Sequence, residues 1–317
     1  MFDFRQDRDD EGIAPARPPL SFLRSQTAPD VDLDETQIQP IAGLPPLIRA
    51  MRPLQWSKNL LVFAALIFTR SVFDLDPLLR SAGAFLVFCA VSSGIYLLND
   101  VRDMNQDRLH PVKRFRPVAA GDLSPRTAIV AASVLILAGL VASVLIEPEL
   151  LLVIALYVGA MLGYNAGLKS TPASVLPYMA AFALLPVCVT LALQPPRWPP
   201  LWIVAGAALL GGGAHFANTL PDLHADAATG VRGLPHRLGE AGSLAAATVL
   251  LALGAAAVPL GAGALPVAGV VALAITAVAV AAVPVSWLRG RRRAAFRLSL
   301  VAAGGVVVTL LASGASL

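Results

Sequence analysis

Residues 127–146 read TAIVAASVLILAGLVASVLI, an apolar run that contains no charged side chain. The hydrocarbon core of a bilayer is about 30 Å thick, and about 20 residues of α-helix cross it. A helix that is apolar on every side cannot be stable when it is exposed to water. This stretch therefore predicts a membrane-spanning helix.

The composition of the whole chain agrees with that prediction. Of the 317 residues, 56% are hydrophobic and only 14% are charged, whereas about 25% are charged in a typical soluble domain. This excludes a water-soluble enzyme, and the two cysteines exclude a disulfide scaffold. Similar apolar runs recur from residue 54 onward, so we predict an all-α polytopic membrane protein with nine transmembrane helices, near 54–73, 80–98, 127–146, 149–168, 173–193, 200–219, 242–261, 266–287 and 297–315.

The first 45 residues have a different character. Nine of the 20 acidic residues lie between Asp3 and Glu35, among several prolines, and no apolar segment of a signal peptide follows. Such a composition is typical of a disordered segment. We therefore predict a disordered cytoplasmic tail over residues 1–45 and an integral membrane domain over residues 46–317.

The basic residues predict how the helices are oriented. With the N-terminus on the cytoplasmic side, 21 of the 24 Lys and Arg residues fall in cytoplasmic segments, and only Arg70, Arg80 and Arg197 fall outside. Cytoplasmic loops of membrane proteins carry an excess of positive charge. We therefore predict a protein of the cell membrane with a cytoplasmic N-terminus and an external C-terminus.

Two acidic motifs of the same form lie at the ends of the second and sixth predicted spans. The first is Asn99-x3-Asp103-x3-Asp107 and the second is Asn218-x3-Asp222-x3-Asp226. The offset between them is 119 residues at each position, and the following spans are displaced by a similar distance. An internal repeat of four helices, with the ninth helix left over, accounts for this pattern.

Spacing of four residues places the three side chains of each motif on one helical face. Like charges stacked in this way destabilise a helix unless a cation lies between them. Carboxylate oxygens are ligands that suit Mg²⁺, which is often shared with substrate phosphates. The motifs therefore predict two Mg²⁺-binding faces on the cytoplasmic side; the alternative is that the acids are solvated helix ends.

Basic residues follow both motifs closely. Lys113, Arg114 and Arg116 follow the first, and Arg232, His236 and Arg237 follow the second. Cations beside Mg²⁺-binding carboxylates are suited to a polyphosphate, although the topology by itself also places Lys and Arg in these loops. Four further residues can lie on the same face: Arg52, Lys58, Tyr164 and Lys169. The alternative for each is that it only anchors the protein at the membrane surface or lies at the membrane interface without a role in binding.

At these residues the chain resembles the UbiA superfamily of intramembrane prenyltransferases, over roughly residues 45–315. The resemblance lies in Asn99-Asp100-x2-Asp103-x3-Asp107 and in Asp222-x3-Asp226. It implies nine helices around a lipid-open cavity. It also implies that Mg²⁺ and a diphosphate are bound by the matching residues: Asp100, Asp103, Asp107, Asp222 and Asp226 as catalytic residues, and Asn99, Asp103, Asp107, Asp222 and Asp226 as metal ligands.

The resemblance extends to a substrate-binding set and to the chemistry. The set comprises Arg52, Lys58, Asn99, Lys113, Arg114, Arg116, Tyr164, Lys169, Asn218, Arg232, His236 and Arg237. The implied function is that of a Mg²⁺-dependent membrane prenyltransferase that displaces diphosphate and joins a polyprenyl group to an acceptor. The implied partners are the bilayer, a polyprenyl diphosphate or polyprenyl phosphate, and a small or lipid acceptor. No nucleic acid is implied, and both a monomer and a homo-oligomer are compatible with the sequence.

The two halves of the chain resemble different members of that superfamily. Arg52-Pro-Leu-Gln-Trp-Ser-Lys58-Asn59 and Lys113-Arg-Phe-Arg-Pro117 resemble decaprenyl-phosphate phosphoribosyltransferases, which combine phosphoribosyl diphosphate with a polyprenyl phosphate. Three other segments are closer to general prenyltransferases: Tyr164-Asn-x3-Lys169, Ala217-Asn-Thr-Leu-Pro-Asp222 and Gly230-Val-Arg-Gly-Leu-Pro-His-Arg237. A secondary transporter is the alternative of another class, although transporters place ionisable residues near the bilayer midplane, where these spans have none.

Overall fold

The computed structural model describes residues 43–63, 66, 71, 73–110, 113–193, 195–228 and 230–313. The side chains at positions 57, 58, 61, 224, 225, 228, 292 and 293 are outside this description. The tail that the sequence predicts over residues 1–45 therefore lies almost wholly outside the described residues, as does the side chain of Lys58.

The described part of the chain is all-helical, as the sequence predicts, and contains no strand. Eight of its helices are long and apolar enough to cross a membrane. They are α5 (Leu75–Arg102), α8 (Pro125–Ile146), α9 (Pro148–Ala166), α10 (Leu176–Leu191), α11 (Leu201–Thr219), α13 (Leu234–Ala262), α14 (Val267–Leu288) and α15 (Arg292–Ala312). The chain is an integral membrane protein.

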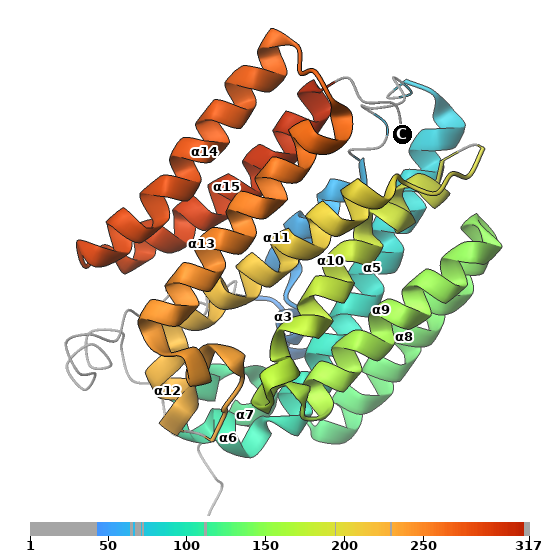
Figure 1. Cartoon of the computed structure of the whole chain (residues 1–317). Helices are drawn as coiled ribbons and strands as arrows, with labels where there is room; N and C mark the ends of the chain where they lie inside the picture. The colour runs from blue at the N-terminus through green and yellow to red at the C-terminus, as the bar shows by residue number, and fades with distance from the viewer. Residues whose placement is uncertain are drawn as a thin grey trace, which may run out of the picture.

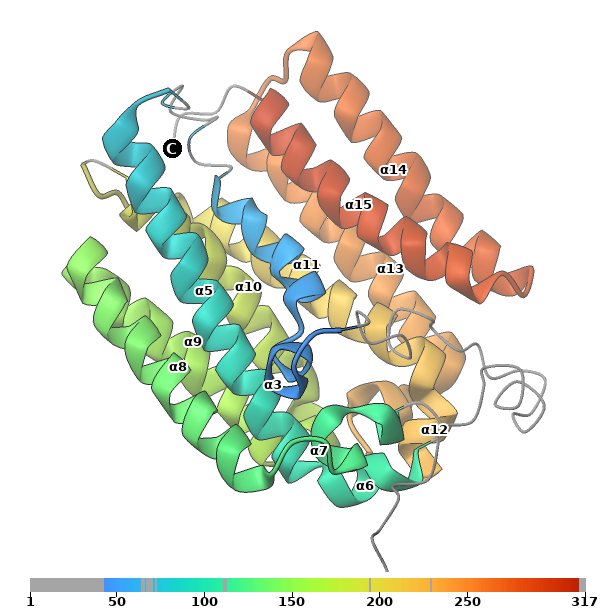
Figure 2. The same ribbon diagram turned by 180° about the vertical axis from the view of Figure 1, so that it is seen from behind.

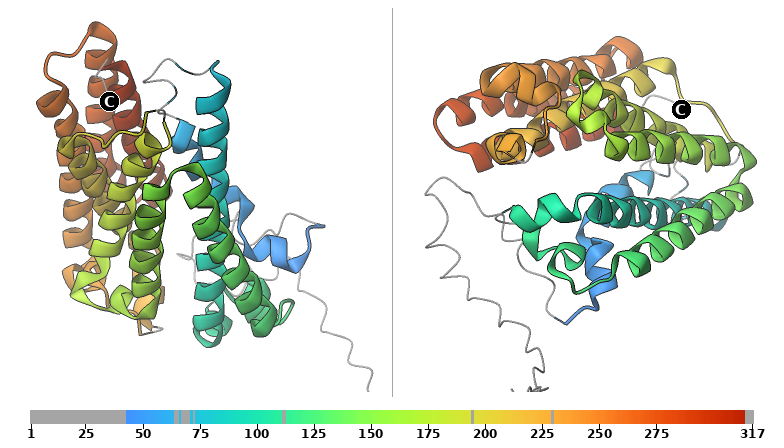
Figure 3. Two further views of the ribbon diagram at one scale, coloured as in Figure 1. Left: turned by 90° about the vertical axis from the view of Figure 1, so that its right-hand side faces the viewer. Right: turned by 90° about the horizontal axis from the view of Figure 1, so that it is seen from below.

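In chain order the eight helices divide into two groups of four, as a four-helix repeat requires. The segment left over is then the first predicted span, whereas the sequence predicts the ninth in that place. Each group begins with a helix that ends in an acidic motif, α5 or α11, and continues through a short helix, α6 (Met104–Leu109) or α12 (Leu223–Ala228). Helices that follow one another in the chain pack together from α5 through α15. Seen from below, α5 and α8 lie on one side and α13, α14 and α15 on the other (Figure 3).

The first predicted span, residues 54–73, differs from the prediction over its described part. Pro53–Phe63 is a 3₁₀-helix, η1, which packs along α5. Side chains three residues apart align in a 3₁₀-helix. Trp56 and Asn59 are aligned in this way, and both form hydrogen bonds with α5. Trp56 donates to the Ser93 hydroxyl at 3.0 Å, and Asn59 donates to the Cys89 sulfur at 3.4 Å. These contacts fit a tighter helix than the sequence periodicity predicts.

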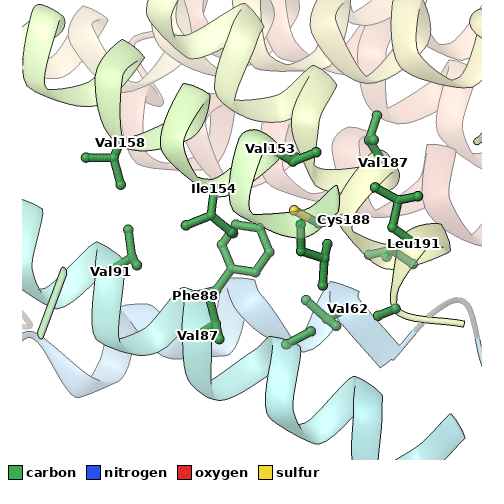
Figure 4. Packing of buried hydrophobic residues seen from close by; sticks show 14 of the residues in the cluster. Val62, Val87, Phe88, Val91, Val153, Ile154, Val158, Val187, Cys188 and Leu191 are labelled. Atoms are coloured by element: carbon green, nitrogen blue, oxygen red, sulfur yellow. The ribbon is translucent and has the colours of Figure 1, made fainter. Parts of the chain in front are cut away.

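An apolar cluster joins η1 to α5, α9 and α10. Figure 4 shows Phe88 of α5 between Ile154 of α9 and Cys188 of α10, with Val62 beside them. All four are buried, and close van der Waals packing of this kind is what holds helices together inside a membrane. The cluster therefore fixes the helices of the first repeat relative to each other.

Small residues of α11 allow it to pack closely on α10 and α13. A Cβ atom on Gly211 would lie 2.6 Å from the Tyr178 carbonyl oxygen, and one on Gly213 would lie 2.9 Å from the Leu251 side chain. Close approach of this kind is how membrane helices associate, because lipid offers no hydrophobic driving force. The outer faces are apolar instead: Val130, Val134 and Leu137 of α8 are each more than 60% exposed, as a lipid-facing stripe requires.

Candidate functional site

The two acidic motifs lie at the same end of the helix bundle. Figures 1 and 2 show α6, α12 and the small helix α7 (Pro117–Ala120) together at this end. The segments that follow the motifs also return here, because α8 and α13 start from it. The repeat therefore brings residues more than one hundred positions apart in the chain into one region.

In the first motif, the helical spacing continues through a break in the helix. Asp103 lies between α5 and α6 with φ −88° and ψ 2°. Its N–H still donates to the Asn99 carbonyl at 2.9 Å, and the Asp107 N–H donates to the Asp103 carbonyl at 2.8 Å. The three side chains therefore keep a common face, as the spacing of four predicts.

The second motif crosses three short elements. Asn218 is in the last turn of α11, Asp222 ends the 3₁₀-helix η5 (Leu220–Asp222), and Asp226 lies in α12. Asn218 is exposed, whereas Asp222 and Asp226 are half-buried. The tighter η5 turn coincides with Pro221, which has no N–H to continue an α-helical ladder.

Asp100 is the most deeply buried acid at this end, at 1% exposure. Its Oδ1 accepts from Arg52 at 2.5 Å and lies 3.4 Å from Arg116, while its Oδ2 has no hydrogen-bond partner among the residues that the structure describes. Arg52 also lies over the Tyr96 ring at 4.7 Å. A buried carboxylate needs such compensation, so Asp100 binds two guanidinium groups rather than facing solvent.

The backbone at Arg52 is unusual and directs the side chain inward. Arg52 has φ 55°, in the left-handed region that residues with a Cβ rarely adopt. On one side Met51 is held by the Ser93 hydroxyl, which donates to its carbonyl at 3.1 Å, and on the other Pro53 fixes φ. The surrounding contacts thus maintain a conformation that orients Arg52 toward Asp100.

Arg116 also pairs with the last acid of the first motif. Its guanidinium donates to Asp107 Oδ2 at 2.9 Å. Burial raises the pKa of Asp107, the positive charge of Arg116 opposes that rise, and the neighbouring Asp100 and Asp103 carboxylates add to it. One cation therefore serves two acids, Asp100 and Asp107.

Two lysines bind Asp103 and Asp226. Lys169 Nζ lies 2.5 Å from both oxygens of Asp103, within the first repeat. Lys113 Nζ lies 2.7 Å from Asp226 Oδ1, so a cation of the first repeat pairs with an acid of the second. The structure therefore brings together Arg52, Asp100, Asp103, Asp107, Lys113, Arg116, Lys169 and Asp226 from the set that the sequence predicts.

Other predicted residues lie outside these ion pairs. Arg114 is exposed and stacks on Phe115 at 4.9 Å, and Arg237 donates to the Arg232 carbonyl at 3.2 Å, with both arginines exposed. Asn99 is half-buried. Neither ring nitrogen of His236 has a hydrogen-bond partner among the described residues.

Aromatic rings surround the remaining predicted residue, Tyr164. Its ring contacts those of Tyr178 and His215, at centroid distances of 5.3 and 6.1 Å. His215 in turn lies 3.2 Å from the Ser174 hydroxyl. The sequence set omits Tyr178, Ser174 and His215, since an isolated serine or histidine in an apolar stretch carries no signal beyond core packing.

The acids of this end are ligands of the kind that Mg²⁺ takes, but the described side chains are not gathered into a metal site. Among the residues that the structure describes, no group of three or more His, Cys, Asp or Glu side chains is gathered closely enough to hold a metal. Instead, lysine ammonium groups lie on Asp103 and Asp226, so these carboxylates already bind positive charge. Carboxylate oxygens are suitable ligands for Mg²⁺, and the second, buried oxygen of Asp100 has no hydrogen-bond partner within the described part of the chain.

Comparison with known sequences agrees with these features. A model of the UbiA prenyltransferase family matches residues 60–310. The decaprenyl-phosphate phosphoribosyltransferase of Mycolicibacterium smegmatis is 44% identical over 142 residues, which cover 42% of this chain and 45% of that protein. The enzyme of the same name from Corynebacterium glutamicum is 34% identical over 208 residues, 63% of each chain. The chain thus matches less than two thirds of the length of these curated relatives.

Solved structures have the same fold. A digeranylgeranylglyceryl phosphate synthase superposes with a TM-score of 0.64 at 21% identity, covering 89% of this chain and 99% of that one. A UbiA homologue from Archaeoglobus fulgidus, bound to GPP and Mg²⁺, superposes with a TM-score of 0.62 at 17% identity, covering 83% and 98%. At these identities the likeness shows the fold alone.

Proposed function

The chain belongs to the UbiA prenyltransferase family, and from that premise we propose that it is a Mg²⁺-dependent membrane transferase that displaces diphosphate from its donor substrate. One observation carries the proposal. The Lys113–Asp226 pair joins the two repeats at the end where the Lys169–Asp103 pair also lies. Alternating carboxylates and cations at one end can bind a metal ion and a diphosphate together.

We assign roles to the acids on this basis. Asp103, Asp107, Asp222 and Asp226, with Asn99, would hold Mg²⁺, which when bound stabilises the negative charge on the departing diphosphate. Asp100 is better suited to positioning Arg52 and Arg116, because both guanidinium groups converge on its buried oxygen.

The cations would bind the anionic groups of the substrates. Lys113, Arg116 and Lys169 would contact the diphosphate, since their charged groups already lie among the acids. Arg52, Tyr164 and His236 would line the same region. The exposed members of the substrate-binding set, together with Lys58, would act at its cytoplasmic entrance: Arg114, Asn218, Arg232 and Arg237.

For the substrate, we favour phosphoribosyl transfer to a polyprenyl phosphate. An oxygen of the polyprenyl phosphate would attack carbon 1 of phosphoribosyl diphosphate, the bond from that carbon to the diphosphate oxygen would break, and diphosphate would leave with the electron pair. The relatives of 34% and 44% identity carry the name of this reaction. Positive groups fixed in advance would lower the barrier by stabilising charge as it develops on the leaving group.

Prenyl transfer from a polyprenyl diphosphate to another acceptor is the second candidate. It is favoured by the segments Ala217–Asp222 and Gly230–Arg237 of the second repeat, which resemble general prenyltransferases. A secondary transporter finds no support in the family or in the relatives.

The experiment supplies purified protein in nanodiscs with Mg²⁺ and one of two substrate pairs. The first pair is phosphoribosyl diphosphate with decaprenyl phosphate, and the second is a polyprenyl diphosphate with an aromatic acceptor. Diphosphate release and the mass of the lipid product are measured. We expect the phosphoribosylated lipid from the first pair. A prenylated acceptor from the second pair alone would establish the second candidate, and release of diphosphate from neither would contradict the proposed function.

We also propose that the acidic end faces the cytoplasm. The proposal rests on the 21 of 24 basic residues that would then lie inside. Reporter fusions after Gly121 and after Leu317 test it: the first should report a cytoplasmic position and the second an external one. A cytoplasmic report from the fusion after Leu317 would contradict the nine-span topology.

A further inference from the structure

The connection between α9 and α10 carries Lys169 and packs against the start of α13. It consists of the 3₁₀-helices η3 (Leu168–Ser170) and η4 (Pro172–Val175). A Cβ atom on Gly233 would lie 2.5 Å from the Lys169 carbonyl oxygen and 2.9 Å from the Ser174 hydroxyl oxygen. Gly233 has φ −66°, which any residue can adopt. Glycine is therefore required at position 233 because there is no room for a side chain, and not because of the backbone conformation.

One buried hydroxyl holds this contact together. Ser174 is 0% exposed, and its Oγ accepts the backbone N–H of Leu234 at 2.9 Å. The same oxygen lies 3.2 Å from His215 Nε2. Because the Leu234 N–H uses an acceptor site of the hydroxyl, the hydroxyl proton stays available for the imidazole. Ser174 therefore joins the connection to both α11 and α13.

Aromatic packing holds the imidazole in place. The His215 ring lies 4.8 Å from the Tyr178 ring and 6.1 Å from the Tyr164 ring, centroid to centroid, and the residue is 3% exposed. Tyr164 belongs to the last turn of α9, directly before the connection that carries Lys169. The contacts among these three rings therefore hold His215 of α11 and also the end of α9, from which the connection with Lys169 begins.

We infer that Ser174 and His215 are positioning residues that hold Lys169 against Asp103, an inference that rests on the proposed function. Lys169 reaches both Asp103 oxygens at 2.5 Å from a segment only three residues long between turns. The Lys169 carbonyl packs on Gly233 at the start of α13. Ser174 holds the same contact through Leu234 and His215, so the place of the segment depends on the hydrogen bonds and packing at Ser174. Displacement by about 1 Å at a reacting site can cost a large factor in rate.

The primary variant is Ser174→Ala, with Ser143→Ala as the matched control. Ser143 is also 0% exposed and donates one hydrogen bond to a backbone carbonyl, the Leu140 carbonyl at 2.7 Å, in α8. We expect Ser174→Ala to raise KM for the diphosphate-bearing substrate by about tenfold, and Ser143→Ala to leave KM unchanged. Equal KM values in the two variants would overturn the inference.

Two substitutions at His215 separate its hydrogen bond from its packing. His215→Phe keeps an aromatic ring beside Tyr178 but removes Nε2, whereas His215→Gln keeps a polar group that can reach Ser174. Phe should reproduce the defect of Ser174→Ala, and Gln should restore KM at least in part. If Phe retains the wild-type KM, the hydrogen bond does not position Lys169.

A double-mutant cycle with Lys169→Ala tests the route of the effect. Positioning through Lys169 predicts that Ser174→Ala adds no further change in KM once Lys169 has been replaced, because coupled residues are not additive. Independent, multiplicative effects of the two substitutions would contradict it.

A readout that needs no turnover separates this inference from the proposed function. The rate at which an amine-specific reagent modifies Lys169, measured by mass spectrometry, should rise several-fold (about threefold or more) in Ser174→Ala relative to Ser143→Ala, because a displaced ammonium loses its carboxylate partner. An increased rate in a protein that transfers no substrate would leave the positioning role standing and reject the proposed function. An unchanged rate in an active protein would reject the positioning role alone.

Discussion

The two acidic motifs have the same residue spacing, but the two repeats differ in how the charges around the motifs are paired. At the offset of 119 residues that aligns the motifs, Lys113 aligns with Arg232 and Asp100 aligns with Thr219. Lys113 reaches across to Asp226 of the other repeat, whereas Arg232 is exposed. Asp100 is buried under two guanidinium groups, whereas the Thr219 hydroxyl donates to the His215 carbonyl of its own helix at 2.9 Å.

This difference shows that duplication of the scaffold did not duplicate the site. The first repeat and the segment before it supply the cations in the described ion pairs of Asp100, Asp103, Asp107 and Asp226. These cations are Arg52, Lys113, Arg116 and Lys169. The second repeat supplies carboxylates to the shared region. In these ion pairs the first repeat therefore contributes both charges, whereas the second contributes a carboxylate alone.

The largest expected effect is a loss of turnover when the central acid of either motif is replaced, and we expect it to be equal in the two motifs. Asp103→Asn and Asp222→Asn each keep the side-chain volume but remove the charge that would hold Mg²⁺. Turnover should fall by about 10² or more, or about 2.7 kcal/mol in the barrier, because the metal stabilises charge that develops on the leaving group. Steady-state kinetics at varied Mg²⁺ measures this.

Asp122→Asn is the control for that pair. Asp122 pairs with Arg49 at 2.8 Å, outside both motifs, so this variant should keep wild-type turnover. If Asp103→Asn and Asp222→Asn both turn over normally at low Mg²⁺, the acids are solvated helix ends and the shared metal is contradicted.

The next effect separates Asp100 from its counterpart Thr219. Asp100→Asn leaves two guanidinium groups with a neutral partner, so we expect it to lower the free energy of unfolding by about 2 kcal/mol. Thr219→Ala removes one hydrogen bond within a helix and should cost about 1 kcal/mol or less. Thermal unfolding in nanodiscs, followed by tryptophan fluorescence, compares them. Equal losses would mean that the extra acid has no special structural role.

A smaller effect distinguishes Lys113 from Arg232. Lys113→Ala should raise KM for the diphosphate-bearing substrate by about tenfold with little change in kcat, because the ammonium contacts charge that is present before the reaction. Arg232→Ala, at the aligned position, should change KM by less than about threefold, as exposed cations contribute little. The opposite order would show that the second repeat supplies the cation that matters.

The smallest effect belongs to the tail. Residues 1–42 lie outside the described residues and have no apolar periodicity in the sequence. A chain that starts at Gly43 should keep turnover within about twofold of the full chain, since segments without a packed face contribute little to a fold. Loss of all activity at normal expression would reveal a functional segment in the tail.

The sequence by itself determined the membrane class, eight of the helices and the repeat. Runs without charge such as 127–146 leave a helix in lipid as the stable option, because every backbone polar group must be satisfied within the segment. The offset of the two motifs likewise predicts which helices correspond. The form of the first predicted span could not be read in this way, because the bonds of Trp56 and Asn59 to α5 are tertiary contacts.

Only the tertiary structure decided how the charged residues pair. The sequence places Lys113 and Arg114 side by side, yet Lys113 binds Asp226 while Arg114 stacks on Phe115. Nothing local in the chain distinguishes the two, because the choice depends on where α12 lies relative to the loop after α6. The same holds for Ser174, whose hydroxyl matters only because the packing of α11 and α13 brings His215 and Leu234 to it.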